Sequence, residues 1–115
     1  MNNHNLSFMR SLCMGNILEE ILFPFPKIKE NEKELIKTTF DSLSSWLKGK
    51  EGDFRKWDKT GDIPKEFIEE MKQMGLFGFV IPEEFGGLGF SSSAYSRTIQ
   101  ELCRYDGSLA ITAGA

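Results

Sequence analysis

The residues best able to do chemistry in this 115-residue chain are two cysteines, one histidine and a set of carboxylates. Cys13 and Cys103 lie far apart in the sequence, and His4 is close to the first residue. Zinc ligands are usually grouped at short intervals, and a cysteine nucleophile needs a partner histidine. We therefore expect no metal site and no Cys–His nucleophile. We expect instead two reduced thiols of an intracellular protein.

Two further patterns could indicate catalysis or phosphate binding. Glu69 and Glu70 could be paired catalytic carboxylates, but neighbours on a helix point about a quarter turn or more apart, which favours a solvated face. Gly87-Leu88-Gly89 begins like the G-x-G-x-x-G phosphate loop, but Ser92 stands where the third glycine is needed. No repeated strand–helix units surround that stretch either. Neither pattern therefore predicts a catalytic carboxylate pair or a phosphate-binding loop.

Composition narrows the classes of partner. The formal net charge is −3, whereas nucleic-acid binding needs clustered cations, so no nucleic-acid partner is expected. No stretch approaches the ~20 apolar residues of a membrane-spanning helix. Apolar residues make up 40% of the chain, including ten phenylalanines, which suits an apolar core or ligand pocket. The length fits one small domain or part of a larger one.

The spacing of apolar residues predicts helices around a shared core. Asn31 and Glu34 form a capping-box-like pair before a helix that should end near Gly49. Its buried face is predicted from residues spaced three and four apart, namely Ile36, Phe40, Leu43 and Leu47. Residues 50–61 are polar and rich in turn formers, so we expect a surface connector there, anchored by Phe54 and Trp57.

The second half of the chain carries clear helix boundaries. Pro64 suits the first turn of a helix, and Gly75 suits its left-handed end. Ser91 should cap a helix that runs to about Tyr105, with Tyr95, Ile99 and Leu102 on one face. Asp106-Gly107-Ser108 should form a turn and cap a last helix. Residues 75–90 join these parts, and their many apolar side chains predict a connector buried against the helices on both sides.

The connector also carries a family resemblance. Its sequence, GLFGFVIPEEFGGLGF, resembles the signature of the N-terminal helical domain of acyl-CoA dehydrogenases, and the resemblance extends over residues 64–74 and 91–115. Residues 1–30 resemble the leader of the very-long-chain and assembly-factor branch, in Ser7-Phe8, Gly15-Asn16-Ile17 and Phe23-Pro24-Phe25-Pro26. The resemblance implies an all-α fold, with a leader at 1–30 and an incomplete helical domain at 31–115. The last helix is expected to continue beyond Ala115.

The resemblance also implies an activity. Acyl-CoA dehydrogenases remove a proton and a hydride from the α and β carbons of a fatty acyl-CoA, and FAD accepts the hydride. The catalytic carboxylate and most FAD contacts of the family would lie beyond Ala115, so this chain alone is expected to be inactive and to bind no FAD tightly. The implied partners are a long-chain fatty acyl-CoA, electron-transfer flavoprotein and further copies in a homo-oligomer. The implied compartment is the bacterial cytoplasm or the mitochondrial matrix.

The same resemblance indicates substrate-pocket residues. The last helix resembles the family helix that closes the far end of the acyl cavity, where medium-chain members carry two large polar residues four apart. Ala110 and Gly114 match those positions, so they would leave room for a longer acyl chain, with Ile111 between them. The alternative is that small residues only let two helices pack closely. For the whole chain, the alternatives are a non-catalytic helical interaction or assembly module and an inactive gene fragment.

Overall fold

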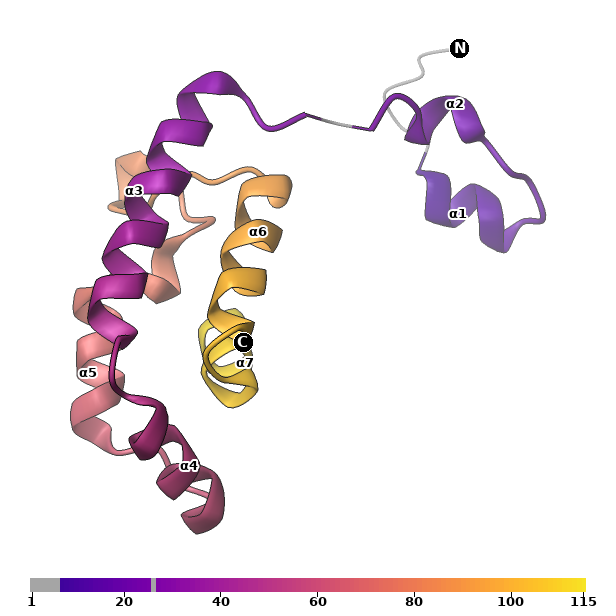
Figure 1. Cartoon of the computed structure of the whole chain (residues 1–115). Coiled ribbons are helices and arrows are strands. Elements are labelled where there is room, and N and C mark those ends of the chain that lie inside the picture. The colour runs from indigo at the N-terminus through magenta and orange to yellow at the C-terminus, as the bar shows by residue number, and fades with distance from the viewer. Residues whose placement is uncertain (1–6, 26) are drawn as a thin grey trace.

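The computed structural model describes residues 7–25 and 27–115, and within them it contains helices and no strand (Figure 1). The all-α prediction is therefore confirmed. In chain order the elements are α1 (Phe8–Cys13), α2 (Glu19–Leu22), α3 (Glu30–Leu47), α4 (Glu51–Thr60), α5 (Lys65–Gln73), η2 (Leu76–Gly78), η3 (Glu83–Phe85), α6 (Ser92–Cys103) and α7 (Gly107–Gly114).

Helix α3 forms one wall of the core. Leu43 and Leu47 are fully buried and Ile36 nearly so, as their spacing predicts. The predicted cap at Asn31 is wrong, because the helix begins at Glu30 and its N-cap, Lys29, makes no side-chain hydrogen bond. Acidic residues occupy the first turn instead, where carboxylates are favoured by the positive end of the helix dipole. One of them, Glu32, bonds to a distant part of the chain, as described below.

The predicted connector at 50–61 is also wrong, because most of it forms helix α4. Phe54 and Trp57 lie three apart and share the inward face, where their rings contact Phe67 of α5 at centroid distances of 5.8 and 4.7 Å. The charged residues lie on the other faces of α4. Packing of the two aromatic side chains against α5 stabilises the helix by more than the low helix propensity of Gly52 destabilises it. Gly61, with φ of 72°, ends the helix in the left-handed region.

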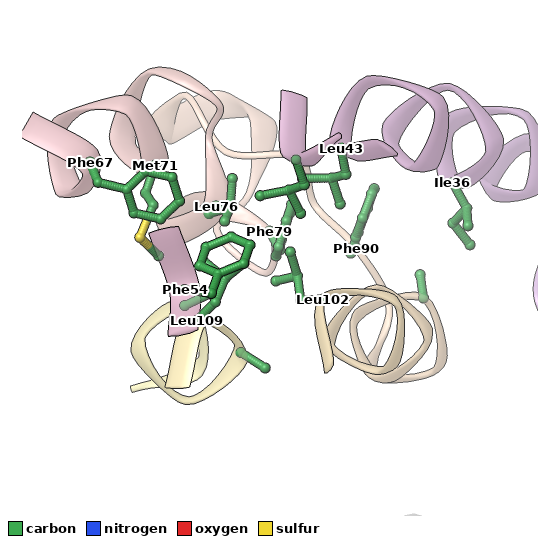
Figure 2. Close-up of a cluster of buried hydrophobic side chains, with 14 residues drawn as sticks. Ile36, Leu43, Phe54, Phe67, Met71, Leu76, Phe79, Phe90, Leu102 and Leu109 are labelled. Atoms are coloured by element: carbon green, nitrogen blue, oxygen red, sulfur yellow. The ribbon is translucent and has the colours of Figure 1, made fainter. Parts of the chain in front are cut away.

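The core lies between the five helices α3 to α7 and the connector, and Figure 2 shows their side chains converging. Pro64 precedes α5, and Gly75 follows it with φ of 75°, as predicted. Phe67 and Met71 are buried on the inner face of α5. The Phe67 ring also stacks on Trp46 of α3 at 5.0 Å between centroids, which joins the two helices.

The connector at 75–90 is only half buried. Leu76, Phe79 and Phe90 lie in the core, and the Phe79 and Phe90 rings stack at 5.6 Å. Leu88 is half-buried against the core. The prediction of burial is wrong for four other apolar residues, which the turns of the connector direct outward. The exposed ones are Phe77, Val80, Ile81 and Phe85.

The connector is nevertheless closed on itself by backbone hydrogen bonds. The amides of Leu88 and Phe90 donate to the carbonyls of Gly78 and Phe79, at 3.0 and 2.7 Å. Gly87 lies against Ile81, so a Cβ built on Gly87 would be 2.0 Å from the Ile81 carbonyl oxygen. Only glycine fits this close approach of two backbone segments.

The last two helices begin at the predicted caps. The Ser91 Oγ accepts from the Ala94 amide at 3.2 Å, and an Asp106 carboxylate oxygen accepts from the Leu109 amide at 2.8 Å. The buried face of α6 is rotated from the predicted one. Its fully buried residues are Ala94, Thr98 and Leu102, whereas Tyr95 and Ile99 are half-buried and Cys103 is exposed.

The segment before α3 forms two short helices, α1 and α2. Ser7 caps α1 by accepting from the Arg10 amide. No residue of either helix is buried. Several large apolar side chains of this segment are exposed, namely Met9, Leu12, Met14, Ile17, Ile21, Phe23 and Phe25.

Candidate functional site

The three predicted pocket residues lie together on α7. Ala110 is buried, Ile111 is 74% exposed and Gly114 is exposed. With residues of α6 and the following Ala115 they line one open depression on the protein surface. Its full lining is Ile99, Cys103, Ala110, Ile111, Gly114 and Ala115. We call this the α6–α7 depression.

The chemistry of the α6–α7 depression is that of an apolar contact surface. Apart from the thiol of Cys103, its side chains are aliphatic or absent, and no carboxylate, amine or imidazole lines it. Such a surface can hold an alkyl group through burial of apolar area, but it cannot transfer a proton.

A second depression adjoins the first, on the side of the connector. It shares Gly114 and Ala115 with the α6–α7 depression, and α6 contributes Tyr95 to it. Its full lining is Leu76, Phe77, Phe79, Val80, Tyr95, Ala113, Gly114 and Ala115. We call this the connector depression. Phe77 and Val80, which are exposed, line this depression and so form part of one apolar surface.

Tyr95 is the residue of this site that sequence reasoning missed. Its hydroxyl donates to the Gly114 carbonyl oxygen at 3.5 Å, at the long limit of a hydrogen bond. A Cβ built on Gly114 would lie 3.1 Å from that hydroxyl and 3.7 Å from Cδ1 of Ile99. Gly114 therefore allows α6 and α7 to approach closely, which gives the packing alternative a physical basis. The sequence placed Tyr95 on a helix face but contained no signal for its partner.

The paired carboxylates do not form a catalytic pair. Glu69 Oε1 contacts Lys72 Nζ at 2.6 Å on the exposed side of α5. Glu70 Oε2 accepts from the Trp46 indole at 2.8 Å and from Lys50 Nζ at 3.4 Å. The indole hydrogen bond is the main reason that the pKa of Glu70 lies below its usual value. Glu70 therefore stays ionised near neutral pH and joins α5 to α3 and Lys50, a structural role.

Other candidate chemistry finds no support in the described residues. Within 7–25 and 27–115, no three metal-ligating side chains are grouped together. Cys13 and Cys103 are exposed free thiols, and His4 lies outside the described residues. Of the helices that the structure describes, none has both the length and the apolar character to span a bilayer.

The glycines of the connector do not form a phosphate cradle. The amides of Gly87 and Gly89 donate to the carbonyls of Pro82 and Ile81, at 3.2 and 2.9 Å. The Leu88 amide is likewise bonded within the connector. A dinucleotide phosphate binds to free backbone amides at a helix start, and these three amides are already occupied. This stretch therefore does not fit the phosphates of FAD.

Comparison with known proteins identifies relatives across the chain. The sequence model of the acyl-CoA dehydrogenase N-terminal domain matches residues 32–115. The chain is 29% identical over 103 residues to the Mycobacterium tuberculosis protein named "Probable acyl-CoA dehydrogenase FadE10", a match that covers 90% of this chain. It is 26% identical over 110 residues to the very long-chain specific acyl-CoA dehydrogenase of Rattus norvegicus mitochondria, covering 95% of this chain.

A third relative matches a shorter stretch with higher identity. It is the 3-(aryl)acrylate reductase of Clostridium sporogenes, 42% identical over 50 residues, which cover 44% of this chain and 13% of that protein. The chain spans only 16% and 17% of the length of the mycobacterial and rat relatives. The activities in these names therefore belong to proteins several times longer than this chain.

Proposed function

Because the chain belongs to the acyl-CoA dehydrogenase family, through that family's N-terminal domain, we propose that it is the helical N-terminal part of an FAD-dependent acyl-CoA dehydrogenase. The proposed reaction removes hydrogen from the α and β carbons of a fatty acyl-CoA and gives a 2-enoyl-CoA. The observation that carries the proposal is the match over residues 32–115, together with relatives that extend over the leader.

The contribution of this chain to that reaction is binding of the acyl group. The α6–α7 depression offers aliphatic side chains and no titratable carboxylate or imidazole, which suits the end of an alkyl chain and no chemical step. We assign Ala110, Ile111 and Gly114 to this role. Since neither Ala110 nor Gly114 fills space with a long side chain, the proposed substrate is a long-chain acyl-CoA.

FAD and the catalytic carboxylate belong, in this proposal, to parts of a longer protein. The amides of Gly87, Leu88 and Gly89 are already bonded within the connector, so this stretch does not fit the phosphates of FAD. The chain by itself is proposed to be inactive. The same proposal includes electron-transfer flavoprotein as the electron acceptor, a homo-oligomeric state, and a location in the bacterial cytoplasm or the mitochondrial matrix. It also places the boundary between the leader and the helical domain at residue 30.

The leader favours a second candidate, a helical interaction module. Seven large apolar side chains between Met9 and Phe25 are exposed, which is unusual for a monomeric protein surface. The coding sequence after codon 115 separates the candidates. A reading frame that continues into the remaining domains supports the enzyme, whereas a stop codon with a stably expressed product supports the module and contradicts the enzyme.

A further inference from the structure

The contact between Tyr95 and Gly114 lies where the two apolar depressions adjoin. Tyr95 and Ile99 are four residues apart, so they lie one above the other on α6. Tyr95 lines the connector depression and Ile99 lines the α6–α7 depression, while Gly114 borders both. The position of a Cβ on Gly114 falls between these two side chains, 3.1 Å from the tyrosine hydroxyl and 3.7 Å from Ile99 Cδ1.

The surfaces on the two sides of this contact are alike. Ala110 and Ile111 lie on one side, and Phe79 and Val80 on the other. The tyrosine is half-buried, and among the described residues its hydroxyl bonds only to the Gly114 carbonyl, at the long distance of 3.5 Å. Removal of the ring would therefore leave no strong polar group unsatisfied and would join two apolar surfaces.

Resting on the proposed function, we propose that Tyr95 is a specificity-determining residue whose ring limits how far an acyl chain extends along α7. An alkyl chain in the α6–α7 depression meets the phenol ring at Gly114. Without the ring, the chain can continue into the connector depression. Tyr95, rather than Gly114 alone, then sets the longest acyl group that binds fully.

The test compares three variants in the full-length, FAD-loaded protein that contains this chain. Tyr95→Ala removes the ring, and Tyr95→Phe keeps the ring and removes the hydroxyl. Tyr105→Ala is the matched control, because Tyr105 is also half-buried against the core but lines neither depression. The measurements are kcat/KM for saturated acyl-CoA substrates from C8 to C22, and Kd for S-alkyl-CoA thioethers of the same lengths, which cannot be dehydrogenated.

We expect Tyr95→Ala to move the optimum toward longer chains. Burial of two additional methylenes should raise both kcat/KM and affinity for the longest acyl chains by about tenfold. This increase is relative to the values for the chain length that the wild type prefers. Tyr95→Phe and Tyr105→Ala should leave the chain-length profile unchanged. An unchanged profile in Tyr95→Ala would overturn the proposal, and so would an equal shift in either of the other two variants.

Failure of this inference is distinguishable from failure of the proposed function. If the wild-type protein dehydrogenates no acyl-CoA of any length, the proposed function fails. If the wild type is active and Tyr95→Ala keeps its profile, only the role of Tyr95 fails. If Tyr95→Ala does not fold, Tyr95→Leu replaces it, because leucine keeps an apolar side chain that is smaller than tyrosine. The proposal then predicts the same shift of thioether Kd toward longer chains for Tyr95→Leu.

Discussion

The Glu32 carboxylate accepts two hydrogen bonds from Ser91, which lies 59 positions further along the chain. The Ser91 backbone amide donates at 2.8 Å to one carboxylate oxygen, and the Ser91 hydroxyl donates at 3.0 Å to the other. The same Ser91 oxygen accepts from the Ala94 amide and caps α6. One carboxylate in the first turn of α3 therefore fixes the residue at which the connector ends and α6 begins.

This arrangement predicts acid-sensitive stability. The backbone hydrogen bond from Ser91 is the main cause that lowers the pKa of Glu32 below its usual value of 4.5, against the opposing effect of desolvation. A carboxyl group whose pKa is lower in the folded protein than in the unfolded protein stabilises the fold when it is ionised. This stabilisation is fully present above the pKa of the unfolded state and is lost as the pH falls through the pKa of the folded state. Glu32→Gln should therefore lower Tm at neutral pH, and the difference from wild type should shrink below about pH 4.5.

Thermal unfolding followed by circular dichroism between neutral and acidic pH measures this difference. The matched control is Glu34→Gln, which changes an exposed carboxylate on the same helix. An equal loss of Tm from Glu32→Gln at every pH would show that the charge of Glu32 contributes nothing through Ser91.

The adjacent glutamates of α5 should respond differently to the same substitution. Glu70→Gln weakens the hydrogen bond from the Trp46 indole and the contact with Lys50, so we expect a loss of about 1 kcal/mol in the free energy of unfolding. Glu69→Gln removes only an exposed ion pair with Lys72, so its effect should stay below about 0.5 kcal/mol. Urea denaturation of both variants measures the contrast, and equal effects would contradict the structural role of Glu70.

Two glycine-to-alanine changes should have opposite signs. Gly87→Ala places a Cβ at 2.0 Å from the Ile81 carbonyl oxygen, so the connector must open and the free energy of unfolding should fall by about 2 kcal/mol or more. Gly52 lies inside α4 with nothing within 4 Å of an added Cβ, so Gly52→Ala should stabilise by about 0.5–1 kcal/mol. Urea denaturation checks both, and a stable Gly87→Ala protein would refute the close packing of the connector.

The caps at Ser91 and Asp106 and the helix end at Gly75 could be predicted because their determinants are local. Ser91 and Asp106 each bond to an amide three residues away, and Gly75 takes the left-handed conformation at the end of its helix. The family signature also spans a continuous stretch. Such features depend on residues that are neighbours in the sequence, and the sequence shows them directly.

The predictions that were wrong, and the features that were not predicted, depend on contacts between residues that are far apart in the sequence. Helix α4 was not predicted because its stability comes from Phe54 and Trp57 packing on Phe67, whereas its own sequence is polar. The exposure of Phe85 and the pairing of Tyr95 with Gly114 likewise depend on how separate helices meet. The pocket positions came from resemblance, and their chemical role stays a proposal.

The proposed acyl role of α7 predicts a change in chain-length preference. In the full-length protein, Gly114→Glu should fill the α6–α7 depression and press on Tyr95 and Ile99. Exclusion of four methylenes would cost ~3 kcal/mol, so kcat/KM for the longest substrates should fall more than about a hundredfold relative to short ones.

The control for that change lies on the same helix. Gly107 is the first residue of α7, and nothing lies within 4 Å of an added Cβ, so Gly107→Glu introduces the same side chain away from the depression. It should leave the ratio of long-chain to short-chain kcat/KM unchanged. If a folded Gly114→Glu enzyme also keeps the wild-type ratio, Gly114 serves helix packing alone.

The central claim, that this chain is the N-terminal part of an acyl-CoA dehydrogenase, is tested most directly by anaerobic titration of the full-length protein. The protein is loaded with FAD and mixed with a saturated long-chain acyl-CoA, while flavin absorbance and thioester products are followed. The predicted result is bleaching of the flavin together with 2-enoyl-CoA in an amount equal to the reduced flavin. Flavin that stays oxidised with every saturated acyl-CoA, in a folded and loaded protein, would contradict the claim.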